Sequence, residues 1–148
     1  MSVGDNRAYA RSVVSLLAAS GVSEAVLCAG NRNAALLEAF ASQNRIKVFS
    51  HFSESSAVFF ALGRIKLHGH PVAVVTTSGT AACELLAGVC EAFYEELPLQ
   101  LVTADLPSRF RGKGAPQGID QRELFGGHVR GFWDIEKAEE LPLPEEIS

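Results

Sequence analysis

Four short apolar segments recur along the chain, and each is followed by a polar loop and a helical pattern. They indicate strands at residues 25–28, 46–49, 72–75 and 99–103, and the run 129–133 is a candidate fifth strand. Strands that are apolar throughout and separated by helices are typical of a parallel sheet covered on both faces. The pattern therefore predicts an α/β fold, a doubly wound parallel sheet flanked by helices.

Helical periodicity fills the intervals between these strands. Helices are expected over residues 6–20, 34–40, 54–67 and 80–95, with Asp5 or Asn6 as the cap of the first and Gly21 at its end. The helix over 54–67 is apolar almost all round, which predicts burial on several sides.

The polar loops follow the carboxyl ends of the strands. In a doubly wound sheet these loops gather at one edge, where ligands bind. The loops at 29–33, 50–54, 76–80 and 104–118 are therefore expected to lie near one another.

The length of 148 residues suits one domain with one core, which we expect to span residues 1–135. Residues 136–148 contain five glutamates and two prolines, with too little apolar content for an element of their own. This acidic stretch is expected to be a linker to further domains.

Composition excludes several classes of function. A net charge of -4 with few basic clusters argues against nucleic-acid binding. No apolar run approaches the roughly 20 residues of a membrane helix, and no N-terminal signal is evident, so a soluble cytoplasmic protein is expected.

Cys28, Cys83 and Cys90 are odd in number and form no C-x-x-C pair, which favours buried thiols over disulfides or zinc. No spacing of ligand residues indicates a metal bound by this chain.

Glu54 opens the most apolar helix. One interpretation is a first-turn acid that complements the helix dipole. The other is a carboxylate that loses hydration between a buried strand and a buried helix, which suits it to sharing a proton. Position alone does not decide between them.

The run Thr77-Ser78-Gly79-Thr80 lies at an expected helix N-terminus, where free N–H groups and hydroxyls could hold an anion or a polar ring. An ordinary cap with a close-packed glycine is the alternative. The run lacks the lysine and the glycine spacing of a P-loop or a Rossmann fingerprint.

Arg32 follows the first strand and is a candidate clamp for a carboxylate or phosphate, because its planar fork binds such groups bidentately. A solvated loop arginine is the alternative.

The loop from Asp105 to Gln121 carries Gln117 and is long, polar and glycine-rich, which is more typical of a functional loop than of a plain connection.

Several stretches, taken together in their order, are specific. They are His51-Phe52-Ser53-Glu54 with Ala57-x-x-x-Ala61-Leu62-Gly63, Pro71 to Ala81, Leu101 to Asp105, and Gly114-Ala115-x-Gln117-x-Ile119-x-Gln121. Residues 6–135 thereby resemble the N-terminal, pyrimidine-binding domain of thiamine-diphosphate enzymes, and most closely the synthases of menaquinone biosynthesis.

The resemblance implies that this domain binds the aminopyrimidine ring of thiamine diphosphate. Glu54 matches the glutamate that hydrogen-bonds N1′ and stabilises the imino tautomer, whose 4′-nitrogen takes the thiazolium C2 proton. Ser78, Gly79 and Thr80 match cofactor-binding positions. The implied reaction decarboxylates a 2-oxo acid, 2-oxoglutarate, and adds the succinyl semialdehyde unit to isochorismate.

Substrate contacts carry over residue by residue. Arg32 matches the arginine of the family's Pro-Gly-Ser-Arg-Ser-Thr loop, in which Asn31 replaces the serine. Gln117 matches the family glutamine, while Pro116 replaces the neighbouring asparagine. Leu106 stands where the family has an arginine that helps to bind the substrate carboxylate.

The resemblance also implies partners. Diphosphate and Mg²⁺ are bound by a Gly-Asp-Gly…Asn motif in a separate C-terminal domain, which this chain lacks. The active site then forms against the diphosphate-binding domain of a partner subunit, in a homodimer or homotetramer, and the isolated domain is expected to be inactive. The apolar Glu54 helix suits such an interface.

Other interpretations stay open. One is a diverged thiamine-diphosphate decarboxylase or synthase with another acceptor, and another is a non-catalytic binding module of the same fold. A third is a nucleotide-phosphate-binding domain that uses Thr77 to Thr80.

Overall fold

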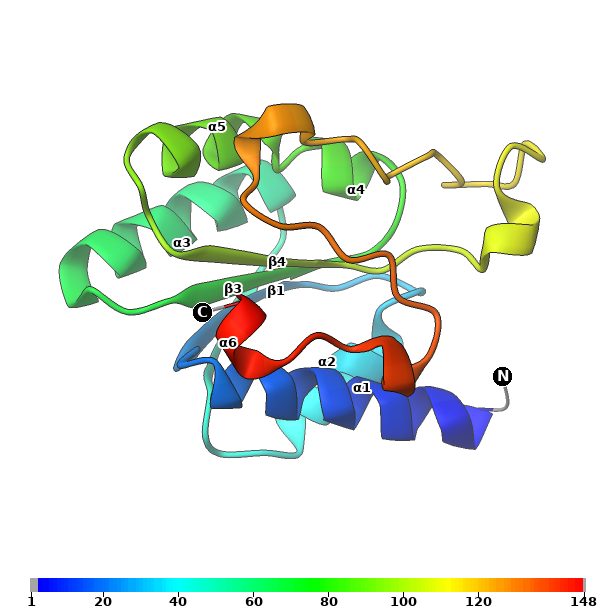
Figure 1. Ribbon diagram of the computed structural model, residues 1–148, viewed down its shortest axis with the longest axis horizontal. Coiled ribbons are helices and arrows are strands. Elements are labelled where there is room, and N and C mark those ends of the chain that lie inside the picture. Colours follow the sequence, from blue (N-terminus) through cyan, green and yellow to red (C-terminus); the bar gives the residue numbers. More distant parts are fainter. Residues whose placement is uncertain (1–2, 148) are drawn as a thin grey trace.

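The computed structural model describes residues 3–147, with side chains from residue 6 onward, and contains a parallel sheet between two layers of helices (Figure 1). The strands are β1 (Glu24–Cys28), β2 (Lys47–His51), β3 (Val72–Thr76) and β4 (Leu99–Thr103). They lie in the order β2-β1-β3-β4, and every neighbouring pair is parallel. The predicted α/β class and the four strands are confirmed.

The helices divide between the two faces of the sheet, as Figure 1 shows. The longer ones are α1 (Val3–Ala19), α2 (Ala34–Ala41), α3 (Glu54–His68) and α5 (Leu86–Tyr94). The short ones are α4 (Thr80–Cys83), η1 (Ser108–Phe110), η2 (Gly126–His128), η3 (Ala138–Glu140) and α6 (Pro144–Ile147). One apolar cluster joins the sheet to α1 and α2, and a second joins it to α3 and α5.

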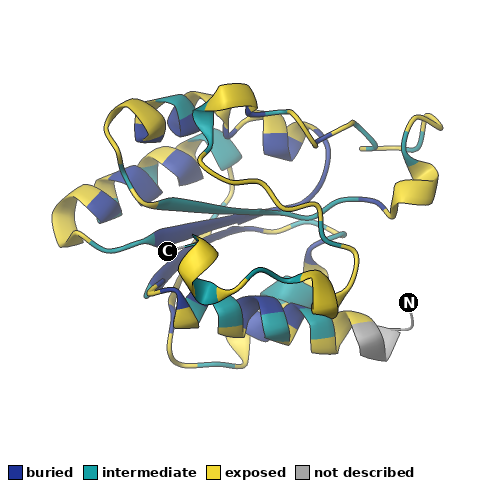
Figure 2. Cartoon of the chain, in the orientation of Figure 1, coloured by how far each residue is buried: buried dark blue, intermediate teal, exposed yellow. Residues whose placement is uncertain are grey.

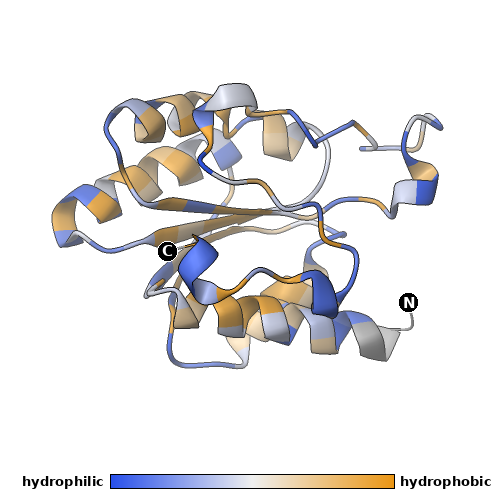
Figure 3. Ribbon diagram, in the orientation of Figure 1, coloured by the Kyte–Doolittle hydropathy of each residue, from blue (hydrophilic) through white to orange (hydrophobic). Residues whose placement is uncertain are grey.

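Both faces of the central strands β1 and β3 are buried (Figure 2). Ala25 and Val75 pack toward α1 and α2, whereas Val26 and Val74 pack toward α3 and α5. Successive residues of a strand point to opposite faces of the sheet. Side chains on both faces therefore contact apolar neighbours. This double burial explains why the strand segments are apolar throughout, and Figure 3 shows the apolar residues concentrated between the layers.

Helix α1 begins earlier than predicted. It starts at Val3, ahead of the expected cap at Asp5 or Asn6, and the chain turns at Gly21 with φ of 92°.

Helix α3 is buried along one face only, so the prediction of burial on several sides is wrong. Ala57, Ala61 and Ile65 face the core, but Phe59 is 50% exposed and Leu67 is 71% exposed. The sheet can cover only one side of a helix, and the apolar residues on the other side face solvent.

The predicted helix over 80–95 is divided into α4 and α5, with a turn at Glu84 and Leu85 between them. Cys83 lies in α4 and is exposed, Cys90 is partly exposed, and Cys28 is buried. The expectation of three buried thiols is therefore confirmed for Cys28 and wrong for Cys83.

The predicted fifth strand is absent: residues 129–133 have no regular structure. The ring of Trp133 lies over Gly131, 2.4 Å from the place where a Cβ would sit, and Phe132 is half exposed. Arg111 holds the following residue, Asp134, by two hydrogen bonds of 2.7 Å. Side-chain contacts, rather than pairing with the edge strand β4, fix this segment.

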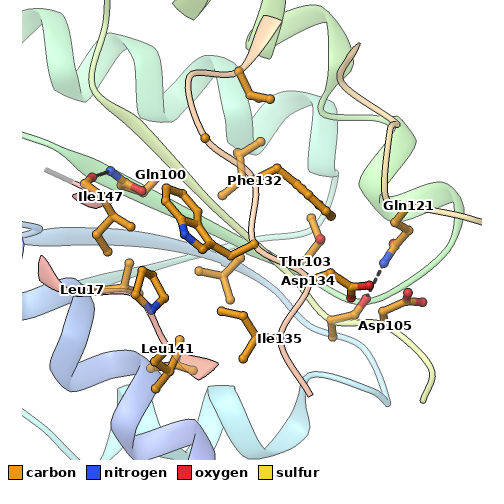
Figure 4. A pocket seen from close by; sticks show the side chains of 18 of the residues that line it. Leu17, Gln100, Thr103, Asp105, Gln121, Phe132, Asp134, Ile135, Leu141 and Ile147 are labelled. Atoms are coloured by element: carbon orange, nitrogen blue, oxygen red, sulfur yellow. Dashed lines mark hydrogen bonds between the residues drawn. The ribbon is translucent and has the colours of Figure 1, made fainter. Parts of the chain in front are cut away.

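The stretch after residue 135 docks on the domain, so the expectation that it forms no element is wrong. It contains η3 and α6, and Leu141 and Ile147 pack against the α1 cluster. The Gln100 amide donates to the Ile147 carbonyl (Figure 4). Its role as a linker stays a prediction. Within residues 3–147, no helix combines the length and apolar character that a membrane span requires.

A partly buried ion pair lies at the amino ends of the strands. Arg64 on α3 donates to Glu24 at the start of β1 through Nε (2.7 Å) and Nη2 (2.5 Å). Its guanidinium also lies over the Phe49 ring, 5.1 Å from the centroid. The hydrogen bond from Arg64 holds the pKa of the Glu24 carboxyl below its usual value, against the opposing effect of burial.

Replacing this carboxylate tests its contribution. Glu24→Gln should lower the free energy of unfolding of the 148-residue chain by about 1–2 kcal/mol at pH 7, because it removes a charge-assisted hydrogen bond. The folded-state pKa lies below the unfolded one, so this stabilisation is present above the unfolded pKa of about 4 and is lost as pH falls through the folded value. Urea denaturation between pH 7 and pH 3 measures it.

Glu38→Gln is the control. Glu38 pairs with Arg7 at 3.0 Å, but both side chains are 54% exposed, and exposed pairs contribute little. A stability difference between wild type and Glu24→Gln that stayed constant down to pH 3 would contradict the assigned role.

Candidate functional site

Three strand-exit loops meet at the carboxyl edge of the sheet around Arg32. Its Nη1 donates to Ser78 Oγ (3.2 Å) and to Gln117 Oε1 (2.9 Å), and its Nη2 donates to the Pro116 carbonyl (2.9 Å). We call Arg32, Ser78, Pro116 and Gln117 the Arg32 cluster. The predicted meeting of the loops at 29–33, 76–80 and 104–118 is confirmed.

The loop that carries Arg32 is shaped by a buried asparagine. Asn33 is fully buried, donates through Nδ2 to the Cys28 carbonyl (2.8 Å) and accepts at Oδ1 from the Gly30 N–H (2.9 Å). A Cβ on Gly30 would lie 2.4 Å from Thr77 Cβ, so only glycine lets the two loops approach this closely. Sequence reasoning did not select Asn33, although an asparagine at a strand exit was a signal for a side-chain turn.

The second close approach lies between Gly79 and Gln117. Gly79 has φ 80° and ψ -136°, and a Cβ there would lie 3.0 Å from Gln117 Cα. Gln117 itself has φ 56°, which is unusual for a residue with a side chain. Backbone strain of this kind persists only where the surroundings hold it in place, and it is common at binding sites.

Gln121 is buried and connects the loop after β3 to the loop after β4. Its Oε1 accepts from the Gly79 N–H (3.3 Å), and its Nε2 donates to the Ala104 carbonyl (3.2 Å). Sequence reasoning included Gln121 in a motif but did not select it as a site residue. Its signal was the spacing of four residues from Gln117.

Glu54 is the first residue of α3, after the cap Ser53, whose hydroxyl accepts from the Ser56 N–H (3.4 Å). Its side chain is partly buried, and no group within residues 3–147 hydrogen-bonds its carboxylate. Burial, and then the charge of Glu54, raise the pKa of the Cys28 thiol to about 11. The carboxylate therefore acts at the carboxyl end of β1, where the loop of Arg32 begins, but no contact joins it to the Arg32 cluster.

The remaining predicted site residues face solvent. Asn31 and Thr80 are both exposed, and within the described chain neither side chain makes a hydrogen bond. They are available to a ligand but are not part of the Arg32 cluster.

The run from Thr77 to Thr80 offers few free donors for a phosphate. Helix α4 has only four residues, and the Gly79 N–H is already bonded to Gln121. The Thr77 hydroxyl is buried and has no partner. These contacts favour the close-packed interpretation over a phosphate site. Among residues 3–147, no group of three His, Cys, Asp or Glu side chains could hold a metal ion.

Two positions on the loop after β4 offer no free charge to a ligand at the Arg32 cluster. Leu106 is 9% exposed, so its side chain belongs to the core. Arg111 is paired with Asp134 and lies 3.5 Å from Asp105. In contrast, Arg32 has only neutral acceptors in the described chain, which leaves its charge available to an anion.

A cavity of about 1110 Å³ extends along β4 from this loop region toward α6. It lies between α1 and the segment after residue 128 (Figure 4). Figure 4 shows Phe132 and Ile135 on one side of it, with Asp105 and Gln121 at its polar end. Arg32 is the one member of the Arg32 cluster that lines it, so this arginine borders a space large enough for a ligand.

The chain can be placed in a family. Residues 7–124 match the family described as "Thiamine pyrophosphate enzyme, N-terminal TPP binding domain". The chain therefore belongs to the thiamine pyrophosphate enzymes, as an N-terminal domain of the α/β type. Among the described residues the partly buried Glu54 carboxylate has no hydrogen-bond partner, which leaves it free to accept from a ligand.

Relatives narrow the comparison within this family. The chain is 49% identical over 134 residues to a 2-succinyl-5-enolpyruvyl-6-hydroxy-3-cyclohexene-1-carboxylate synthase of Akkermansia muciniphila. This match covers 90% of this chain and 25% of the relative. Proteins of the same name from Bdellovibrio bacteriovorus (48% over 131 residues) and Halobacterium salinarum (44% over 140 residues) cover 88% and 95% of this chain. The chain spans 23–25% of the length of these three relatives.

The fit between Gly79 and Gln117 can be tested by adding one methyl group. Gly79→Ala should lower the free energy of unfolding of the 148-residue chain by about 1–3 kcal/mol, because alanine disfavours this backbone conformation and its Cβ meets Gln117. Gly63→Ala is the matched control, since Gly63 lies within α3 and has no atom within 4 Å of a Cβ. That change should raise stability by about 0.5–1 kcal/mol. Equal effects of the two substitutions in urea denaturation would contradict the assignment.

Proposed function

We propose that this chain is the pyrimidine-binding domain of a thiamine-diphosphate-dependent synthase that decarboxylates 2-oxoglutarate and adds the succinyl semialdehyde unit to isochorismate. The observation that carries the proposal is the Glu54 carboxylate, which has no hydrogen-bond partner among the described residues and lies at the carboxyl edge of the sheet. The names of the relatives support the choice of reaction.

Glu54 is the proposed catalytic residue. Its carboxylate would hydrogen-bond N1′ of the aminopyrimidine and would hold the shared proton at that atom. The neighbouring Cys28 and the Ala57 side chain of α3 are buried, which keeps bulk water from one side of this carboxylate. Thiamine diphosphate, when bound, supplies the electron sink that decarboxylation of a 2-oxo acid needs. Ser78, Gly79 and Thr80 form the adjoining wall of the proposed cofactor site.

Arg32 is the proposed binding group for a substrate carboxylate. Its fork is held by three neutral acceptors, so a carboxylate can approach without displacing a salt bridge. Gln117 supplies an amide beside it, and the exposed Asn31 precedes it. Because Leu106 is buried, the loop after β4 presents no cation at that position.

The rest of the active site is proposed to come from outside this chain. Diphosphate and Mg²⁺ are assigned to the C-terminal diphosphate-binding domain of a partner subunit in a homodimer or homotetramer. The isolated domain is therefore proposed to be catalytically inactive. The exposed apolar side chains Phe52, Phe59 and Leu67 on and before α3 support an interface there. We place the synthase in the cytoplasm.

The role of Glu54 is tested in the full-length protein. Glu54→Gln should reduce thiamine-diphosphate-dependent release of CO₂ from 2-oxoglutarate by about 10²–10⁴-fold, because glutamine cannot share the proton. Circular dichroism should show an unchanged fold. Glu38→Gln, on the distant surface of α2, should keep wild-type activity. Normal CO₂ release by Glu54→Gln would sink the proposed role.

The role of Arg32 predicts an effect on substrate affinity. Arg32→Gln should raise the KM for a carboxylate substrate by about 10–100-fold, which corresponds to losing one charge-assisted hydrogen bond. The KM for thiamine diphosphate should stay unchanged. Arg45→Gln is the control, because Arg45 is an exposed loop arginine before β2. Steady-state kinetics of the full-length protein separate the outcomes, and equal substrate KM values in both variants would refute the assignment.

A further inference from the structure

Gln121 is a buried amide whose two ends bond to the exits of neighbouring strands. Oε1 accepts from the Gly79 N–H, three residues after β3, and Nε2 donates to the Ala104 carbonyl, directly after β4. Ala104 is itself bonded to β3 through the Thr76 carbonyl (3.0 Å). Gln121 therefore closes the gap that opens where the two strands turn away from each other.

Gln117 lies four residues before this bridge. Gln117 is exposed and keeps its left-handed backbone while packed on Gly79. The loop before it contains Gly112 and Gly114, both with positive φ and with open space around them. The chain before Gln117 is thus open around these two glycines, whereas the chain after it is held by the two hydrogen bonds of Gln121.

Gln117 in turn helps to orient Arg32. The Arg32 Nη1 is shared between Gln117 Oε1 and Ser78 Oγ, and Nη2 is bonded to Pro116, the residue before Gln117. Two of the three bonds to the guanidinium thus come from the turn that Gln121 anchors. A movement of this turn would rotate the fork that faces the cavity.

We propose that Gln121 is a positioning residue, which holds the turn at Gln117 so that the Arg32 fork is preset for a substrate carboxylate. The inference rests on the proposed function, because it assumes that Arg32 binds the substrate. Figure 4 shows the Gln121 side chain at the polar end of the cavity, directed toward the end of β4 beside Asp105. Its amide oxygen and nitrogen are both bonded to backbone groups, so the proposal assigns it an action through Gln117 and Arg32 and no bond to the substrate.

Gln121→Met in the full-length enzyme tests this, because methionine keeps the volume and removes both hydrogen bonds. The KM for the carboxylate substrate should rise about tenfold, in line with losing a buried hydrogen-bonded link. The kcat should change less than about twofold, because Glu54 lies beyond β1 from this bridge.

Gln43→Met is the matched control. Gln43 is also a bridging amide, with Nε2 donating to the Phe40 and Ile46 carbonyls, both at 2.9 Å, but it lies between α2 and β2, away from the site. Both variants should lose stability, and only Gln121→Met should change the substrate KM. A fall in melting temperature with an unchanged KM for Gln121→Met would show a merely structural role and overturn the inference.

A double-mutant cycle adds a second criterion. If Gln121 acts through Gln117, the KM effects of Gln121→Met and Gln117→Ala should be strongly non-additive. Additive effects would overturn the inference. If Gln121→Met does not fold, Gln121→Glu, which keeps the acceptor for the Gly79 N–H, replaces it under the same criteria. Absence of CO₂ release by the wild-type enzyme would overturn the proposed function and the inference with it, whereas an active wild type with an unaffected Gln121→Met overturns the inference alone.

Discussion

The close packing of the strand-exit loops depends on two positions that carry no side chain. Gly30 lets the loop at 29–33 pack against Thr77. Gly79 lets the loop at 76–80 pack against Gln117. Without these approaches the Arg32 guanidinium could not reach acceptors from two other loops at once. The candidate site therefore depends on the close approach of the loop backbones, which brings its polar side chains within reach of one another.

The parallel sheet brings these loops to the same level. Cys28 pairs with His51 and Thr76 pairs with Thr103, so all four strands end together. Helix packing on both faces keeps the strands in place, while one side of α3 stays apolar and exposed. The same helix thus belongs to the core through one face and offers a contact surface through the other.

Charge is distributed unequally between the two edges of the sheet. At the amino edge, Glu24 and Arg64 neutralise each other in a partly buried pair. At the carboxyl edge, Glu54 and Arg32 have no partner of opposite charge within the described chain. Charges that are satisfied internally contribute to stability, and charges that are left unpaired are available to a ligand. The fold places its paired charges and these two unpaired charges at opposite ends of the strands.

The sequence by itself determined the fold class, the four strands and the edge where the loops meet, because apolar runs and helical periods follow directly from burial on two faces. Its motifs also selected Glu54, Arg32 and Gln117. The tertiary structure alone decided that 129–133 forms no strand, that α3 is open on one side and that residues after 135 dock on the core. It also decided that Asn33 and Gln121 support the site. These outcomes depend on contacts between residues distant in the chain, such as Gln121 with Gly79 or Arg111 with Asp134, and no local pattern encodes them.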